Sequence, residues 1–147
     1  MAFKPLTGSP NIPKFPYVAD ASTSFTTGYL AYRDTSTGEI KEMTSTTGDV
    51  TTIECIIAET TTTAASNPVI DGIPLFDGMM VEADCTNNTA ANQLNKAHLL
   101  TDGGTVNNTS THSTDVNAVF VALRITGEAS DKKLIGRIAL RLGQAAA

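Results

Sequence analysis

The segment Ala118–Ile125, with the sequence AVFVALRI, decides the fold. Valine, leucine and isoleucine at its odd-numbered positions alternate with phenylalanine, alanine and arginine at the even-numbered ones. Two largely apolar faces are typical of a central strand in a sheet. After a polar connection, Leu134–Leu142 shows the same period of two, with Ile138, Leu140 and Leu142 directed inward and Arg137, Ala139 and Arg141 outward. The two segments together predict an antiparallel β-hairpin that closes the core.

Working outward from this hairpin, the chain contains further short segments that predict strands. They are Tyr29–Tyr32, joined by the turn Asp34–Gly38 to Glu39–Thr44; Thr51–Glu59; two short pieces of Val69–Phe76 around an Asp-Gly turn; and Gly78–Cys85. Cys55 and Cys85 each fall on the apolar face of their strand. We therefore expect an all-β protein built as a small antiparallel β-barrel.

Two later segments are less regular. Thr89–Leu100 is compatible with a short helix, or with a turn through Ala91–Asn95 that leads into a strand at Lys96–Thr101. We favour the turn and strand, with about one helical turn, because asparagine is a poor helix former. Thr105–Thr114 is rich in Asn, Thr and Ser, which predicts an exposed loop.

A short internal echo links two of these segments. Gly28–Asp34 and Gly78–Asp84 share a glycine, an apolar start and an aspartate six residues later. The two segments lie fifty residues apart, and each precedes a turn rich in Thr or Asn. They suggest related halves of one barrel, although so short a match also arises by chance.

The composition limits the classes of function. A chain of 147 residues is long enough for one domain with a real core, and its 5% aromatic content without Trp predicts an aliphatic one. Threonine makes up roughly one residue in six, well above its usual share. The net charge of −5 argues against a protein whose main task is to bind nucleic acid. The sequence shows neither a secretory signal nor a membrane span, so we expect synthesis in the cytoplasm of a cell.

The N-terminal segment differs from the rest of the chain. Four of the six prolines fall within the first sixteen residues, which predicts a segment that neither forms a helix nor pairs within a sheet. We therefore expect an extended arm over residues 1–20 and a single β-domain over residues 21–147. Apolar side chains along this arm are expected to contact a neighbouring subunit: Phe3, Leu6, Ile12, Phe15 and Tyr17.

The sequence contains no recognisable catalytic motif. His98 and His112 are the two histidines, and His112 lies in a run of Thr, Ser and Asn without the apolar residues that would anchor a catalytic site. Cys55 and Cys85 are expected to be buried free thiols, with a disulfide as the alternative if their strands are adjacent. We expect no catalytic residue, no metal site and no cofactor.

Several strand and turn segments resemble head decoration (cement) proteins of tailed bacteriophages. These segments span most of residues 28–141: Gly28–Tyr32, Pro74–Asp84, Gln93–Asp102, Thr105–Thr109 and Val119–Gly136. The resemblance implies a barrel-like or tulip-like body, homotrimers on the outer capsid surface, and arms that reach onto the major capsid protein. It transfers no active-site residue.

Two other classes of protein have a similar size and composition. A receptor-binding or fibre-associated virion protein is the first alternative, although glycine-rich repeats or an aromatic sugar-binding patch are not obvious in the sequence. The second is a small trimeric nucleotide hydrolase of the dUTP-hydrolysing type. The sequence matches neither the nucleotide-binding motifs nor the glycine-rich C-terminal segment of those enzymes.

Overall fold

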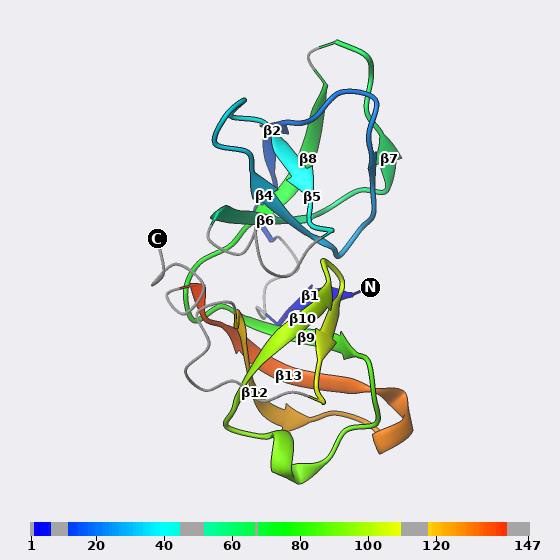
Figure 1. Ribbon diagram of the computed structural model, residues 1–147, viewed down its shortest axis with the longest axis vertical. Helices are drawn as coiled ribbons and strands as arrows, with labels where there is room; N and C mark the ends of the chain where they lie inside the picture. The colour runs from blue at the N-terminus through cyan, green and yellow to red at the C-terminus, as the bar shows by residue number, and fades with distance from the viewer. Residues whose placement is uncertain (1, 7–11, 45–51, 67, 110–117, 141–147) are drawn as a thin grey trace.

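The computed structural model describes residues 2–6, 12–44, 52–66, 68–109 and 118–140 of the chain. Within these residues the protein is all-β, as the alternating sequence predicts. Two sheets follow one another along the long axis of the molecule, and we name them the N-terminal sheet and the C-terminal barrel (Figure 1).

The C-terminal barrel consists of five strands: β9 (Met80–Cys85), β10 (Ala97–Asp102), β11 (Thr105–Asn107), β12 (Phe120–Ile125) and β13 (Lys133–Ile138). The ring closes because β9 pairs antiparallel with β13 on one side and parallel with β11 on the other. Strand β12 lies between β10 and β13, which confirms the predicted central position. Its first three residues and the preceding Val119 are buried, so neighbours cover both faces of this part of the strand.

Details of the predicted hairpin differ from the structure. Leu123 is exposed because the register between β12 and β13 shifts between Ala122 and Arg124, which turns the following side chains. Ala139 is buried, not outward, against Ala97 and Ala118. Arg141 and Leu142 lie outside the described residues.

Two 3₁₀ turns join strands of the barrel. They are η2 (Ala91–Gln93) before β10 and η3 (Ala129–Asp131) before β13. A turn followed by a strand was the favoured interpretation of Thr89–Leu100, and it is confirmed. The segment predicted as an Asn/Thr/Ser loop instead begins with β11, whose Val106 is fully buried; its residues 110–114 lie outside the described part.

The N-terminal sheet has the order β2-β8-β6-β4-β5. Its strands are β2 (Phe15–Val18), β8 (Val69–Pro74), β6 (Ile53–Ile57), β4 (Leu30–Arg33) and β5 (Ile40–Glu42), and a small pair, β3 (Ser24–Phe25) with β7 (Thr61–Thr62), lies beside it. The hairpin β4–β5 confirms the prediction for this part of the chain. Within the described residues, the two edges of the sheet meet at one parallel bridge, between Ala19, which follows β2, and Ile40 of β5.

Strand β8 corrects the predicted Asp-Gly turn. It runs unbroken through Asp71 and Gly72, with Asp71 N–H donating to Glu59 Oε1 (3.0 Å). A Cβ atom at Gly72 would lie 2.7 Å from Cys55 Sγ and 2.9 Å from the ring of Tyr17. Glycine is therefore needed here because two side chains pack directly on the strand backbone.

Two parts of the N-terminal segment are strands of the sheets. Strand β1 (Phe3–Pro5) pairs with β9, and β2 pairs with β8. Phe3 is fully buried beside Phe120, with ring centroids 6.4 Å apart. The expectation that the first twenty residues form an unpaired arm, with strands starting near Tyr29, is therefore wrong. The prolines are tolerated because Pro5 ends its strand and Pro16 lies on an edge strand, where a missing N–H costs little.

One continuous core joins the two sheets. Leu30 and Met43 of the N-terminal sheet pack in the same cluster as Phe3, Val81 and Phe120. The turn between β10 and β11 touches the other sheet through backbone bonds: Leu30 N–H donates to Gly103 O (2.8 Å), and Gly103 N–H donates to Met43 O (3.1 Å). The two sheets are thus one packed unit.

The internal echo corresponds to one repeated local geometry. Gly28 and Gly78 have φ angles of 86° and 88°, which suit glycine. Their N–H groups donate to Ile57 O (2.9 Å) and Ile138 O (2.7 Å), and each following carbonyl accepts the N–H of the same isoleucine at 2.8 Å. The same turn thus starts β4 in one sheet and β9 in the other. Common ancestry of the two halves stays a hypothesis.

Candidate binding surface

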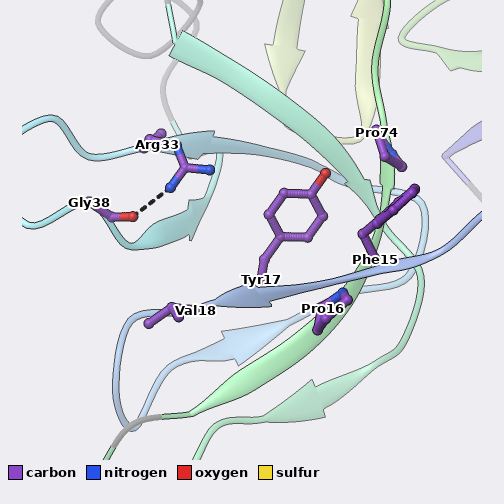
Figure 2. A pocket seen from close by; sticks show the side chains of 7 residues that line it. All are labelled: Phe15, Pro16, Tyr17, Val18, Arg33, Gly38 and Pro74. Carbon is purple, nitrogen blue, oxygen red and sulfur yellow. Dashed lines mark hydrogen bonds between the residues drawn. The ribbon is translucent and has the colours of Figure 1, made fainter.

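A groove runs along the seam where the two edges of the N-terminal sheet diverge. From the Ala19–Ile40 bridge, β2 and the β4–β5 hairpin separate and leave a depression of about 500 Å³, the seam groove. Seven residues line it: Phe15, Pro16, Tyr17, Val18, Arg33, Gly38 and Pro74 (Figure 2). The groove is open at the surface, and most of its lining residues belong to β2.

Tyr17 forms the middle of this groove. It lies opposite Ile70 in the strand register. It is partly buried and packs against a small cluster of buried apolar residues in the N-terminal sheet. Burial raises the pKa of the Tyr17 phenol, with the nearby Cys55 and Glu54 adding to the effect and Arg33 opposing it. The phenol is therefore a neutral hydrogen-bonding group at physiological pH, and its ring is held in place from behind.

Arg33 lies on the other side of the groove. Its Nη2 pairs with Glu54 Oε1 (2.9 Å), and its Nη1 donates to Gly38 O (2.7 Å). The hydrogen bond to Glu54 raises the pKa of the guanidinium. Figure 2 shows Tyr17 between Arg33 and Phe15. The guanidinium is thus oriented by two acceptors and its charge is balanced, so the groove offers planar and apolar surfaces more than free charge.

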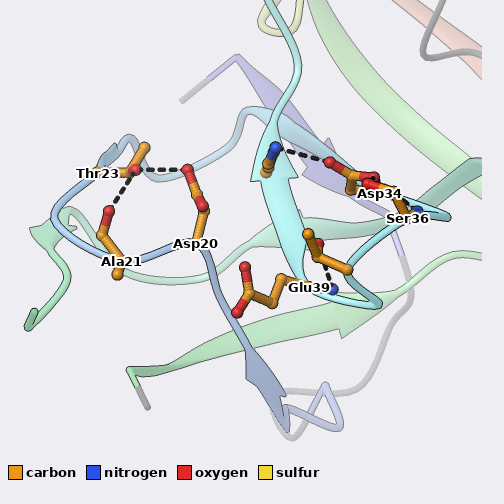
Figure 3. A network of polar contacts seen from close by, with 8 residues as sticks. Asp20, Ala21, Thr23, Asp34, Ser36 and Glu39 are labelled. Atoms are coloured by element: carbon orange, nitrogen blue, oxygen red, sulfur yellow. Dashed lines mark hydrogen bonds and ion pairs between the residues drawn. The ribbon is translucent and has the colours of Figure 1, made fainter. Parts of the chain in front are cut away.

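A network of polar contacts fixes the hairpin that carries Gly38 (Figure 3). Asp34 Oδ2 accepts from Lys41 Nζ (2.7 Å), while Asp34 Oδ1 accepts from the Ser36 N–H (2.8 Å) and hydroxyl (2.6 Å). These bonds hold the pKa of Asp34 far below its ordinary value, with Lys41 as the largest cause. Near the bridge, Thr23 Oγ1 donates to Asp20 Oδ2 (2.9 Å). The hairpin side of the groove is therefore well ordered by local bonds.

Exposed apolar side chains continue from the groove over the edge of the sheet. Phe15 is 51% exposed, Val18 is 53% exposed and Val69 is 57% exposed. Val18 and Val69 are direct partners in the β2–β8 register. We name these three residues the β2 apolar row. Pro16 lies within it and lacks an N–H, which disfavours the addition of another strand, so the row is suited to side-chain contacts.

A second exposed apolar patch lies at the start of β9. Leu6 N–H donates to Met80 O (3.0 Å), and Phe76 precedes the turn into the same strand. Leu6, Phe76 and Met80 are 39%, 56% and 37% exposed. We name them the β9 patch.

The structure places the five residues that were expected to contact a neighbouring subunit in different surroundings. Phe3 is buried in the chain's own core, so its expected contact with another subunit is wrong. Ile12 packs partly against that core, Leu6 belongs to the β9 patch, and Phe15 and Tyr17 line the seam groove. Sequence reasoning missed Val18, Val69 and Arg33. Val18 follows Tyr17 directly, but only the strand register shows that Val69 lies opposite it.

The described residues contain no group of three or more His, Cys, Asp or Glu side chains that could hold a metal ion. Cys55 and Cys85 are free and buried, and desolvation raises the pKa of each thiol to about 12. His98 is buried, with Nε2 2.8 Å from Gln93 O, and His112 lies outside the described residues. The described residues also contain no helix that is long and apolar enough to cross a membrane.

Neither the comparison with protein-family models nor that with curated proteins finds a match to this chain.

Proposed function

We propose that this chain is a head decoration protein of a tailed bacteriophage, which binds the outer surface of the capsid and stabilises contacts between capsomers. The observation that carries the proposal is the β2 apolar row, three large apolar side chains left more than half exposed on an ordered sheet. Exposed apolar groups close together on a protein surface are typical of interaction sites. The resemblance of its strand and turn segments to cement proteins supplies the class of partner, the major capsid protein.

The chemistry of such a function fits this surface. Full burial of one Val or Phe side chain contributes about 1.5–3 kcal/mol, so three half-exposed ones contribute about half of that each. This is too weak for tight binding by a single copy. A homotrimer on the capsid would present three such rows at once, and multivalency then gives a stable attachment. The β9 patch offers a second apolar contact for self-association. In this proposal the chain is made in the host cytoplasm and needs no cofactor, metal, nucleic acid or membrane.

The test is addition of the purified chain to capsids assembled without it. We expect saturable binding and a higher temperature of capsid disruption. Val18→Ser with Val69→Ser should weaken binding at least about tenfold, since each change removes apolar contact area. Leu123→Ser is the matched control, because Leu123 is an exposed apolar residue of the barrel. Absence of binding by the unaltered chain would overturn the proposal.

A receptor-binding or fibre-associated virion protein is the second candidate. The seam groove favours it, because Phe15 and Tyr17 lie together beside an oriented guanidinium. Aromatic rings next to polar groups suit the stacking of sugars. Binding of the chain to host cells or their surface glycans, without binding to capsids, would support this candidate. A nucleotide-hydrolysis assay tests the remaining alternative, a small trimeric hydrolase.

A further inference from the structure

A second, smaller pocket lies where the N-terminal segments cross the junction of the two sheets. Its volume is about 240 Å³, and its apolar lining includes Pro5 of β1 and Ile73 of β8, together with Ile12. Pro5 pairs with Val81 of the barrel and Ile73 pairs with Ile56 of the N-terminal sheet. Both walls are thus held by strand pairing, and the pocket is part of the fold.

Two lysines, Lys4 and Lys14, also line this pocket. Among the described residues neither ammonium group lies in an ion pair, whereas Lys41 and Lys133 both do. Glu82 lies opposite Lys4 in the strand register, but its carboxylate is directed to Lys133 Nζ at 3.8 Å. The described lining therefore combines an apolar floor with two positive charges, in a chain whose net charge is −5.

The size and charge of this pocket limit its occupant. Pockets for small organic ligands usually measure about 300–1,000 Å³, so about 240 Å³ suits a single large side chain better. A carboxylate beside that side chain would meet the two ammonium groups as it docks, and such charge complementarity raises association rates and selects partners. An apolar residue flanked by Asp or Glu provides both features.

We propose that this lysine-rimmed pocket receives one apolar side chain from an acidic surface segment of the major capsid protein. The inference rests on the proposed function and adds to it the chemistry of the partner segment. It assigns the pocket a role distinct from the β2 apolar row: the row supplies apolar area, and the pocket supplies recognition of an acidic sequence.

The experiment compares two double charge reversals on capsids that lack the chain. Lys4→Glu with Lys14→Glu should weaken binding at least about tenfold at low salt, because like charges then oppose each other. The matched control is Lys96→Glu with Lys132→Glu, which changes the net charge equally at exposed lysines away from the pocket. Raised salt should weaken capsid binding of the unaltered chain and the control, and should restore part of the binding of the Lys4/Lys14 variant, because salt screens attraction and repulsion alike.

A filling variant tests the apolar part separately. Ala58 also lines the pocket, and Ala58→Leu would occupy it while both lysines remain. We expect weaker capsid binding with an unchanged salt dependence. Thermal unfolding of each variant confirms that it is folded, and if Ala58→Leu is unfolded the charge reversals decide alone.

Three results overturn the inference. They are equal weakening by both charge reversals, which would indicate net charge only; unchanged binding of the Lys4/Lys14 variant; and failure of the unaltered chain to bind. The third result removes the proposed function as well, whereas the first two leave capsid binding in place and reject only the pocket.

Discussion

The two sheets of this protein differ in how their edges are closed. In the C-terminal barrel, β9 pairs along its length with β13 and also with β1 and β11, so the ring has no long free edge. In the described part of the N-terminal sheet, the β2 and β5 edges meet at one bridge, between Ala19 and Ile40. The barrel side buries Phe3 and Phe120 completely, and the less closed sheet leaves the seam groove. Incomplete closure thus creates the surface on which the proposed function depends.

The largest expected difference concerns two phenylalanines of the N-terminal segment. Phe3→Ala should lower the free energy of unfolding by about 3–5 kcal/mol, because it empties a fully buried site in the closed barrel. Phe15→Ala should change it by less than about 1 kcal/mol, because that side chain is half exposed at the seam. Urea denaturation measures both. Equal effects would show that Phe3 is not part of the core.

The same comparison revises the expected result of a truncation. From the sequence, removal of residues 1–16 should leave folding nearly intact and reduce capsid binding. With Phe3 buried and β1 paired to β9, the truncated chain should instead be strongly destabilised. A truncated chain as stable as the full one would contradict this.

Much of the fold follows from local sequence patterns. Alternation within Thr51–Glu59, Gly78–Cys85 and Ala118–Ile125 predicted three strands. The structure contains a strand within each of these segments, at Ile53–Ile57, Met80–Cys85 and Phe120–Ile125. Local patterns work here because side chains alternate between the two faces of a strand, so a half-buried strand has a period of two.

The parts that could not be predicted depend on contacts between distant residues. Proline suggested that Phe3–Pro5 and Phe15–Val18 were unpaired, yet both pair at places where a missing N–H is tolerated. The parallel pairing of β11 with β9, and the position of Val69 opposite Val18, arise only when the whole ring is assembled. The seam groove was therefore beyond a local analysis of the sequence.

The next expected effect concerns the contact that joins the two sheets. A Cβ atom at Gly103 would lie 2.4 Å from the Met43 carbonyl oxygen, a backbone atom that cannot move away easily. Gly103→Ala should therefore lower the free energy of unfolding by about 1–3 kcal/mol, as overpacking usually does. Chemical denaturation measures it, and a neutral result would show that the sheets separate readily.

The neighbouring glycine provides the control. A Cβ at Gly104 would meet the ring of Tyr29, a side chain, at 2.3 Å. Tyr29→Ala should thus relieve part of the effect of Gly104→Ala, whereas Met43→Ala should not relieve Gly103→Ala. A double-mutant cycle measures this coupling.

The two buried thiols report how readily each sheet opens. Cys55 is fully buried in the N-terminal sheet, and Cys85 is 6% exposed in the barrel. If native burial alone governs access, Cys85 should react faster with a thiol reagent. We expect the reverse order in single-cysteine variants, by at least about tenfold, because a sheet closed by one bridge opens locally more often. Faster reaction of Cys85 would reject the comparison.

The same thiols predict a loss of stability at alkaline pH. Burial raises the pKa of each to about 12 in the folded protein, whereas an exposed thiol titrates near about 8.5. Between these values the unfolded chain loses protons that the folded chain retains, so the free energy of unfolding falls as pH rises above about 8.5. Cys55→Ala with Cys85→Ala should flatten that dependence in urea titrations. An unchanged slope would indicate other titrating groups.

The smallest expected effect concerns the hairpin beside the seam groove. Lys41 and the Ser36 hydroxyl and N–H hold the Asp34 pKa below its ordinary value, so the unfolded chain takes up this proton first as pH falls. The stabilisation is therefore present above the ordinary Asp pKa of about 3.9 and is lost as pH falls toward the folded value. Because these groups lie at the surface, we expect only a slight change in stability. Lys41→Ala should raise the Asp34 pKa clearly, and Ser36→Ala should raise it less, because Lys41 is the larger cause. Titration of the Asp34 carboxyl carbon by NMR measures both shifts. If Lys41→Ala leaves that pKa unchanged, the hairpin is not fixed by this pair, and the ordered side of the seam groove must depend on backbone pairing alone.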